Sequence, residues 1–346
     1  MRVELKGLTE QETEIWAKNQ GLKAYQGRQI RHWLFRKFAT SFEEMTDLPK
    51  ALRARLKEDL CIHHLEKIKT LTSKDGTRKF LYRLRDGHLI ETVLIPEQDH
   101  FTLCISSQAG CAMGCLFCST ARQGLKRDLT AAEIIDQVIQ VKRSMENPDR
   151  LTNIVLMGMG EPLANYDAVI RASKNLISGN GMNFSHRRIT LSTCGLVPQI
   201  RALGRDITIN LAISLNAADD DTRSFLMPVN RRYPLESLIS ACRDFPLPNR
   251  RMITFEYILI RDVNDRPRDA AHISRLLSGL RAKINLIPLN PHPASELSAP
   301  SVETIHRFQE ILLKNHFTAI IRKSRGRDIR AACGQLSGSI SGGKSR

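Results

Sequence analysis

Apolar residues recur in short runs along the chain from about residue 101, and a stretch with helical spacing follows each run. The runs are Leu103–Ser106, Asn153–Met157, Arg188–Ser192, Thr208–Ser214, Ile253–Ile260 and Ile284–Leu289. Short apolar runs that alternate with helical stretches are typical of β-α units, whose strands lie parallel in one sheet. Six repeats predict an α/β fold with a parallel sheet, either open and doubly wound or curved into a partial barrel.

The stretch that begins at Thr130 illustrates the helical pattern. Thr130 suits the N-cap position, and Glu133 three residues later completes a capping box. The apolar positions predict one buried stripe, formed by Ile134, Ile135, Val138 and Val141. A seventh apolar run, Thr318–Ile321, follows the six repeats and leads into the basic segment Arg322–Arg330.

Residues 1–62 have mainly helical patterning and are predicted to form a small accessory domain. In the segment Gln26–Phe38, one face carries Ile30, Trp33, Leu34 and Phe38. The other positions carry Arg28, Arg31, Arg36 and Lys37. A second helix is expected to start with Asp47 near its cap and Pro49 in its first turn. A basic helical pair beside a catalytic domain suits a phosphate backbone, although a lid or a dimer element is an alternative.

Residues 63–100 have strand patterning and predict a β-hairpin extension before the main domain. The β-like runs are Leu65–Leu71, Arg78–Leu84, His88–Pro96 and Phe101–Ser106. Asp-Gly pairs at Asp75-Gly76 and Asp86-Gly87 predict the hairpin turns. The main domain is expected to span residues 101–336, including a C-terminal catalytic loop, and residues 337–346 are expected to be a disordered tail.

Composition limits the partners and the cellular compartment that the protein can be expected to have. The 346 residues carry a formal net charge of +16, which favours a polyanionic partner such as RNA over a merely solvated basic surface. No apolar run is long enough for a membrane span, and the charged N-terminus predicts no signal peptide. Eight cysteines are too sparse for a disulfide scaffold, so we expect a cytoplasmic protein with reduced thiols.

Three of the thiols stand close together, at Cys111, Cys115 and Cys118. A closed structural zinc site needs four protein ligands, and no second pair of matched Cys or His follows. Three thiolates can instead hold three irons of a [4Fe–4S] cluster and leave the fourth iron to another ligand. This C-x3-C-x2-C spacing resembles that of the radical S-adenosylmethionine (SAM) superfamily. The resemblance implies that the amino and carboxylate groups of SAM bind the fourth iron.

Polar and glycine residues follow the predicted strands and are expected to line one mouth of the domain, because barrel sites form at the carboxyl ends of strands. Gly160 and Glu161 follow the second strand, and Glu161 offers an acceptor for the SAM ammonium group. The other candidates for SAM contacts are Ser192, Ser214, Leu215, Asn216 and Asn290. A single polar residue at a strand end is more often a helix cap than a ligand, but Ser192, Ser214, Asn216 and Asn290 on one rim favour contacts to a bound nucleoside.

Two further thiols are candidates for chemistry. Cys104 lies on the strand that leads into the cysteine cluster, and Cys333 follows the basic segment. The neighbouring cations are expected to lower the pKa of Cys333 and make it nucleophilic. The remaining thiols are assigned to core packing, namely Cys61, Cys194 and Cys242.

Several motifs together resemble the dual-specificity radical-SAM RNA methyltransferases. They are the cysteine cluster, Gln123–Thr130, Gly158–Pro162 and Gly326–Leu336, the last ending in Ala-Ala-Cys-Gly-Gln-Leu. The similarity extends from about residue 20 to residue 338. It implies a partial (β/α)6 radical-SAM barrel and methylation of adenine C2 in 23S rRNA and in tRNA next to the anticodon.

The resemblance also implies a covalent cycle. Cys333 takes a methyl group from one SAM, and a 5′-deoxyadenosyl radical from a second SAM removes hydrogen from that methyl. The resulting carbon radical adds to C2. Glu91 matches the general base that removes the C2 proton, and Cys104 matches the thiol that releases the product by forming a disulfide with Cys333. The family further implies a low-potential electron donor such as flavodoxin or ferredoxin, and a monomer.

Two positions depart from the family pattern, and two alternatives remain. Ala121 replaces the usual Gly, and Asn216 stands where many members have His. The related methyltransferases that modify adenine C8 and confer antibiotic resistance share the cluster and both accessory thiols, although the segment Gly124–Ile134 looks more like the C2 enzymes. A zinc-holding, non-enzymatic RNA-binding protein is the second alternative.

Overall fold

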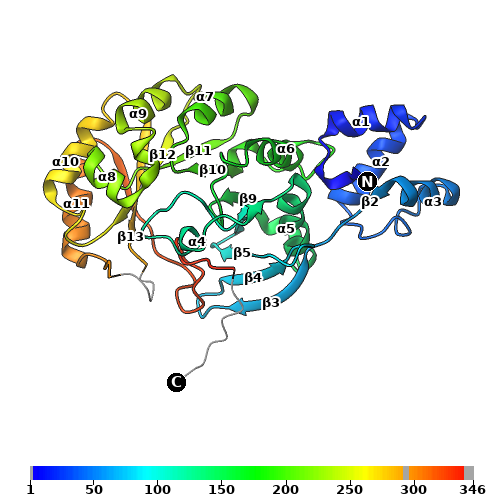
Figure 1. Cartoon of the computed structure of the whole chain (residues 1–346), viewed down its shortest axis with the longest axis horizontal. Helices are drawn as coiled ribbons and strands as arrows, with labels where there is room; N and C mark the ends of the chain where they lie inside the picture. Colours follow the sequence, from blue (N-terminus) through cyan, green and yellow to red (C-terminus); the bar gives the residue numbers. More distant parts are fainter. Residues whose placement is uncertain (1–2, 291–295, 339–346) are drawn as a thin grey trace.

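The computed structural model describes residues 3–290 and 296–338, and its centre is one mixed sheet of ten described strands (Figure 1). The strand order is β14-β13-β12-β11-β10-β9-β6-β5-β4-β3. In chain order the strands are β3 (Glu66–Thr72), β4 (Arg78–Arg83), β5 (Leu89–Pro96), β6 (Phe101–Cys104), β9 (Leu151–Leu156), β10 (Ile189–Thr193), β11 (Asn210–Ser214), β12 (Ile253–Leu259), β13 (Ala282–Pro288) and β14 (Thr318–Ile321).

Within this sheet the seven strands β6, β9, β10, β11, β12, β13 and β14 pair in parallel. They correspond to the six predicted repeats, and the seventh apolar run adds β14 at the edge. Because β14 and β3 are separate edges, the sheet is a partial barrel and not a closed one. The helices between the parallel strands are α5 (Ala131–Arg143), α6 (Tyr166–Ile177), α7 (Val197–Asp206), α8 (Asp220–Leu226), α9 (Leu235–Asp244), α10 (Pro267–Leu276) and α11 (Val302–Lys314).

Helix α5 forms as its sequence predicts. The Thr130 hydroxyl accepts from the Glu133 N–H, and the Glu133 carboxylate accepts from the Thr130 N–H, so both halves of the capping box are present. The predicted stripe is wholly buried against the sheet, at Ile134, Ile135, Val138 and Val141. In the described ranges no helix has both the length and the apolar character that a membrane span requires.

The expected β-extension consists of β3, β4 and β5, which continue the sheet in antiparallel fashion from β6. Gly76 and Gly87 occupy the left-handed region at φ +83° and +87°, as the Asp-Gly turns require. Ser337 and Gly338, at the start of the expected disordered tail, are hydrogen-bonded to Glu91 of β5. The rest of that tail, residues 339–346, lies outside the described residues.

The N-terminal helices stand beside the barrel (Figure 1): α1 (Glu10–Asn19), α2 (Ala24–Phe35) and α3 (Lys50–Asp59). Helix α3 starts at Lys50 with Pro49 as its N-cap, so the expected cap at Asp47 is wrong. Asp47 instead accepts a hydrogen bond from the Trp33 indole at 2.5 Å. Phe38 lies beyond the end of α2, at φ +57°, and not on its apolar face.

Arg31 corrects the predicted basic face of α2, because it is only 1% exposed. Its guanidinium donates to the Leu8 carbonyl, to Thr13 and to the Asn175 side chain of α6. The remaining predicted cations of this helix, Arg28, Arg36 and Lys37, are exposed. Periodicity alone could not reveal that a polar network of α1 and α6 meets the Arg31 side chain.

A buried ion pair also joins the N-terminal segment to the barrel. The Lys6 ammonium lies 2.6 Å from Asp136 Oδ1 of α5, and the two side chains are 0% and 3% exposed. The Leu65 N–H donates to the other carboxylate oxygen at 2.7 Å, so Asp136 also holds the start of the β-extension. Burial opposes ionisation of Asp136, yet hydrogen bonds from His64 and Lys6 hold its pKa below the usual value.

We therefore expect Lys6→Met to lower the free energy of unfolding by about 3 kcal/mol, because it leaves Asp136 buried without its cation. Lys57→Met is the control, since the Lys57–Glu43 pair is more than half exposed, and it should change stability little. Denaturant unfolding of the anaerobically purified proteins measures both. Equal stability of the two variants would contradict a structural role for the buried pair.

Candidate active site

The cysteine cluster lies in the loop that follows β6 and the short strand β7 (Gln108–Ala109), ending in α4 (Ser119–Arg122). Gly110 has φ +79°, and a Cβ there would lie 1.9 Å from the Gly124 carbonyl oxygen, so only glycine permits this crossing. The Cys111 N–H donates to that same carbonyl at 3.2 Å. Further along, the Leu116 N–H donates to the Leu226 carbonyl at the end of α8. The loop is therefore held by the segment after α4 at its start and by the end of α8 near its middle.

The three loop thiols lie within electrostatic reach of one another. Burial raises the pKa of Cys111 to about 12, and the neighbouring Cys118 thiolate adds to the shift. Burial raises the pKa of Cys115 as well, with further contributions from Cys118 and Cys111. Thiols that disfavour one another's ionisation in this way share one small region. A multivalent iron cluster would relieve the repulsion between them by binding them as thiolates.

The spacing of the thiols suits a cluster better than a zinc ion. Ligands around one tetrahedral zinc stand roughly 3.8 Å apart when its Zn–S bonds are about 2.3 Å. Within the described ranges, the group of three candidate ligands that all lie within 4.8 Å of one another is Glu4, Cys61 and His63, and not the loop thiols. Thiolates that bind separate irons stand further apart than this, so the absence of Cys111, Cys115 and Cys118 from such a close group is compatible with a [4Fe–4S] cluster.

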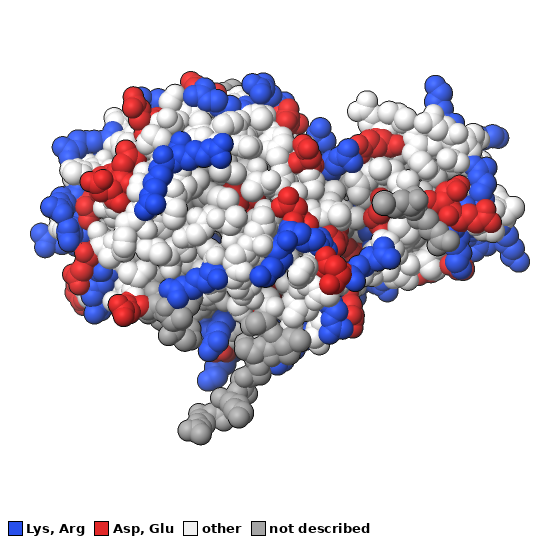
Figure 2. Space-filling view, in the orientation of Figure 1, with Lys and Arg blue, Asp and Glu red and all other residues white. Residues whose placement is uncertain are grey.

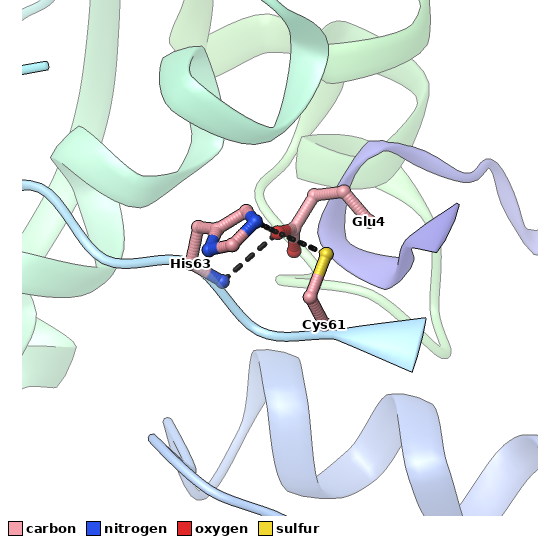
Figure 3. Close-up of side chains that lie close together, drawn as sticks. All are labelled: Glu4, Cys61 and His63. Atoms are coloured by element: carbon pink, nitrogen blue, oxygen red, sulfur yellow. Dashed lines mark hydrogen bonds and ion pairs between the residues drawn. The ribbon is translucent and has the colours of Figure 1, made fainter. Parts of the chain in front are cut away.

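The group formed by Glu4, Cys61 and His63 joins β1 (Val3–Glu4) to the chain after β2 (Leu60–Cys61) (Figure 3). Its polar atoms already have partners. The His63 N–H donates to Glu4 Oε2 at 2.9 Å, and the Cys61 thiol lies 3.7 Å from the same oxygen. Arg85 lies 2.7 Å from His63 Nε2, the nitrogen that would bind a metal. We interpret this group as a polar clamp on the N-terminal strand pair.

The segment after β9 approaches the loop after β6 closely. A Cβ on Gly158 would lie 2.7 Å from the Ile105 carbonyl oxygen, and one on Gly160 would lie 2.6 Å from the Gln108 side chain. Glycine at these two positions thus permits close packing against Ile105 and Gln108. Glu161 is buried, and its carboxylate accepts from the N–H groups of Leu163 and Cys194 at 3.1 and 2.8 Å. Burial raises the pKa of Glu161.

The other polar candidates lie where expected, at the ends of β10 and β11, but some of their groups are engaged. The Ser214 and Leu215 carbonyls accept from Arg223. The Asn216 side chain accepts from the Ile258 N–H at 2.8 Å and lies 3.2 Å from the Met227 sulfur. Ser192 is buried on β10. A SAM contact through the Asn216 amide would therefore replace bonds that now hold β12.

The segment that carries Cys333 lies against the cluster loop. The Ser119 N–H donates to the Gly334 carbonyl at 2.7 Å, and the Thr120 hydroxyl donates to the Leu336 carbonyl at 2.8 Å. Asn290 donates to the Cys333 carbonyl at 3.2 Å. Asn290, predicted to contact SAM, thus also holds the Cys333 segment. Pro291, the next residue, lies outside the described residues.

The β3–β4 hairpin also holds this segment, a role that its Asp-Gly turn did not suggest. The Ser73 hydroxyl donates to Asp328 at 2.5 Å, and the Gly326 N–H donates to Asp75 at 2.9 Å. Hydrogen bonds to the Asp75 carboxylate outweigh its burial and lower its pKa to about 2. Figure 1 shows the C-terminal segment, in red, passing beside this hairpin.

Glu91 lies on β5 and is 2% exposed. Its Oε1 lies 2.9 Å from the Lys79 ammonium, and its Oε2 accepts from the N–H groups of Ser337 and Gly338 at 2.7 and 3.2 Å. Lys79 also donates to the Arg330 carbonyl at 3.0 Å. One lysine therefore connects Glu91 to the segment that carries Cys333.

Comparisons with known proteins identify the family. Residues 105–272 match the radical SAM superfamily, and residues 3–62 match the ribosomal RNA large subunit methyltransferase N-terminal domain. The dual-specificity RNA methyltransferase RlmN of Geobacter sulfurreducens is 53% identical over 338 residues, covering 98% of this chain and 93% of the relative. The chain belongs to the dual-specificity RNA methyltransferase family.

Further relatives agree with this family. The RlmN enzyme of Syntrophobacter fumaroxidans is 51% identical and covers 96% of this chain and 97% of its own length. The crystal structure of a radical SAM methyltransferase from Sphaerobacter thermophilus superposes with a TM-score of 0.92 at 48% identity, covering 97% of this chain and 100% of that one. The predicted fold and both predicted cofactors, a [4Fe–4S] cluster and SAM, are confirmed. These relatives support neither the adenine-C8 enzyme nor the zinc-holding protein.

The two accessory thiols lie within electrostatic reach of one another. Cys104, buried at the end of β6, has a pKa well above the usual value because of burial and then because of the Cys333 thiolate. The Cys333 side chain is accessible to solvent, yet desolvation by the surrounding protein raises its pKa to about 11. The expected lowering by neighbouring cations is therefore wrong, since Arg322 opposes the shift but does not outweigh it.

Glu256 of β12 is a site residue that the sequence did not single out. Its carboxylate is the second cause of the raised Cys333 pKa, after desolvation. It pairs across the sheet with Asn285, whose side chain donates to it at 2.9 Å. An acidic residue inside an otherwise apolar strand is a signal that a closer inspection of Ile253–Ile260 could have used.

Replacing Glu256 with Gln is expected to lower the pKa of Cys333, because it removes a negative charge that disfavours the thiolate. The rate of alkylation at Cys333, followed by peptide mass spectrometry as a function of pH, should then rise at lower pH than in the wild type. Glu310→Gln on the exposed face of α11 is the control and should leave the profile unchanged. An unshifted profile for Glu256→Gln would show that this carboxylate does not act on the thiol.

Proposed function

We propose that the protein methylates C2 of an adenine in 23S rRNA and of the adenine next to the anticodon in tRNA. The observation that carries this proposal is that the segment bearing Cys333 is hydrogen-bonded to the cluster loop through Ser119 and Thr120, with Cys104 within electrostatic reach. Two accessory thiols suit a covalent methyl carrier and its release. Adenine C2 has no lone pair with which to attack a sulfonium methyl group, so the transfer needs a radical route. The bound cluster and SAM would supply that radical.

In this proposal each residue has one task. Cys111, Cys115 and Cys118 hold the cluster, and the polar rim from Gly160 to Asn290 binds SAM. Cys333 attacks the methyl group of one SAM through its sulfur, becomes S-methylcysteine, and later carries that carbon to C2. After the adduct radical has given up one electron, which the bound cluster would accept, and Glu91 has taken the C2 proton, Cys104 attacks the Cys333 sulfur. The S–S bond forms as the bond from that sulfur to the added carbon breaks, the electron pair of the broken bond passes to the carbon, and the carbon takes a proton to become the methyl group of the released RNA.

Glu91 is proposed to take the C2 proton. Its carboxylate now holds Lys79 on one side and Ser337 and Gly338 on the other, so proton transfer requires one of these contacts to open. Lys79 lies 2.9 Å from Glu91 Oε1 and holds the carboxylate in place within the buried segment. Opening at Ser337 and Gly338 would free one carboxylate oxygen while the lysine contact remains.

RNA is proposed to bind over exposed cations on two parts of the molecule. The segment after β14 exposes Arg322, Lys323, Arg325, Arg327 and Arg330, next to Cys333. The N-terminal helices expose a second set that includes Arg28, Arg36 and Lys37. Figure 2 shows basic side chains at both ends of the visible face, interspersed with acidic ones. The protein is proposed to act in the cytoplasm as a monomer, with flavodoxin or ferredoxin as electron donor.

The covalent cycle predicts different outcomes for two thiol variants. Cys333→Ala should keep its iron and sulfide but carry no methyl group and form no methyladenine. Cys104→Ala should still be methylated at Cys333 and still add to RNA, but it should stay attached to that RNA, since a blocked late step accumulates its intermediate. A denaturing gel and a mass spectrum of each anaerobically purified variant distinguish these outcomes.

Cys242→Ala is the matched control, because Cys242 is a buried thiol on α9 that has no role in the proposed cycle. It should keep turnover close to the wild-type value. RNA joined to Cys333→Ala, or methyladenine formed by either site variant, would show that the thiol roles are wrongly assigned.

The proposed RNA surface predicts a steep dependence of affinity on salt. Each lysine or arginine that neutralises a phosphate should contribute roughly 0.7 to 0.9 to the slope of log affinity against log salt concentration. Lys323→Ala should reduce that slope and lower the affinity for 23S rRNA fragments and for tRNA by similar factors. Filter binding at several salt concentrations measures the slope. Lys314→Ala is the comparison, because Lys314 is exposed on the last turn of α11. An equal loss of RNA affinity in both variants would argue against a defined RNA-binding surface.

A further inference from the structure

Arg223 of α8 is wholly buried at the ends of β10 and β11. Its guanidinium donates to the carbonyl oxygens of Cys194 at 2.7 Å and Leu215 at 3.0 Å, and to Asn230 Oδ1 at 2.8 Å. A further contact reaches the Ser214 carbonyl at 3.2 Å. The side chain therefore fixes two strand ends that line the proposed SAM site.

The same guanidinium lacks a carboxylate partner. In the part of the chain that the structure describes, no Asp or Glu oxygen lies within 4.0 Å of it. Buried charges in proteins are normally paired, and arginine does not escape by losing its proton. A cation held in this way, with carbonyl oxygens alone, is explained if an anion occupies the neighbouring site.

The loop that carries Cys111, Cys115 and Cys118 lies next to the end of α8. The Leu116 N–H donates to the Leu226 carbonyl at 3.0 Å, three residues beyond Arg223. A Cβ on Gly114 would lie 3.5 Å from Pro228, the residue that begins the next turn of the chain. Met113, Cys115 and Phe117 pack against an apolar group formed by Cys194, Leu226, Met227, Ile260 and Leu289. The cysteine loop therefore packs against the C-terminal end of α8 and the turn that follows it.

Electrostatics connect Arg223 to the same thiols. Arg223 donates to the carbonyl of Cys194, and Cys115 packs against the apolar group that contains Cys194. Desolvation lowers the pKa of Arg223, and Asp220, which opposes this shift, is joined to the guanidinium only through the Asn230 side chain. Glu161 acts on the opposite side, because it raises the pKa of both thiols. Cys194 lies between the two charges, since its N–H donates to Glu161 and its carbonyl accepts from Arg223. Arg223 and Glu161 therefore bind opposite backbone groups of Cys194 and do not contact one another as an ion pair.

We propose that Arg223 is a positioning residue that provides the counter-charge of the iron–sulfur cluster and raises the cluster's reduction potential. A cluster bound by three thiolates is anionic, and each electron that it accepts makes it more negative, so a fixed neighbouring cation favours the reduced form. The electron comes from a low-potential one-electron donor, and no bond of the protein breaks. The inference rests on the proposed function, because it requires the cluster at Cys111, Cys115 and Cys118.

The test is a redox titration of the anaerobic holoenzyme with dithionite, in which electron paramagnetic resonance reports the reduced cluster. Arg223→Met and Arg223→Gln remove the charge, and at fixed solution potential the ratio of reduced to oxidised cluster should fall at least tenfold, equivalent to 59 mV for one electron. Arg223→Lys keeps the charge with fewer hydrogen bonds and should remain closer to the wild type than either neutral variant.

Arg31→Met is the matched control. Arg31 is equally buried and also donates to carbonyl oxygens, but it lies in the N-terminal helices away from the cluster loop. It should lower the melting temperature without changing the potential. A purely structural role for Arg223 would make its variants behave like Arg31→Met.

The outcomes separate this inference from the proposed function. Wild-type protein without iron and sulfide would refute the proposed function itself. Neutral variants that hold the cluster at the wild-type potential, or a lysine variant no better than the neutral ones, would overturn the role of Arg223. If both neutral variants fail to hold the cluster, retention by Arg223→Lys supports a need for the positive charge, and loss in Arg223→Lys overturns it.

Discussion

The hydrogen bond from the Ser119 N–H to the Gly334 carbonyl is the contact on which the site depends. It joins the loop that holds the cluster thiols to the segment that carries Cys333, although the two residues are far apart in the sequence. The C-terminal segment has no regular helix or strand between β14 and residue 338 to fix its path. Its position is therefore determined by side-chain and loop contacts, each with a modest net free energy.

The antiparallel extension explains how such a segment is held. The Ser73–Asp75 turn, Lys79 and Glu91 each bind a different point along it, at Asp328, Gly326, Arg330 and Ser337. A sheet of parallel strands alone would end at β6 and would leave that side of the mouth open. The strands β3, β4 and β5 therefore serve as a support for the reactive loop, beyond enlarging the core.

Much of this arrangement follows from local patterns in the sequence. The parallel strands, the capping box at Thr130 and the Asp-Gly turns depend on neighbouring residues, and each forms as expected. The spacing of Cys111, Cys115 and Cys118 likewise needs only one loop. The burial of Arg31 and the role of Asp75 depend on partners more than a hundred residues away, which periodicity does not reveal. The raised pKa of Cys333 belongs to the same class, because Glu256 and desolvation both come from the fold.

The contacts between residues 73–91 and residues 326–338 also bear on the order in which the candidate site is assembled during synthesis. The hydrogen bond of Asp75 to Gly326 spans 251 residues of sequence, so the hairpin is synthesised long before its partner. Domains fold as their residues leave the ribosome, and contacts this distant form last. The barrel can assemble around its helices while Cys333 is still absent. A nascent chain thus lacks both Cys333 and the contacts that hold its segment until residues 326–338 have emerged.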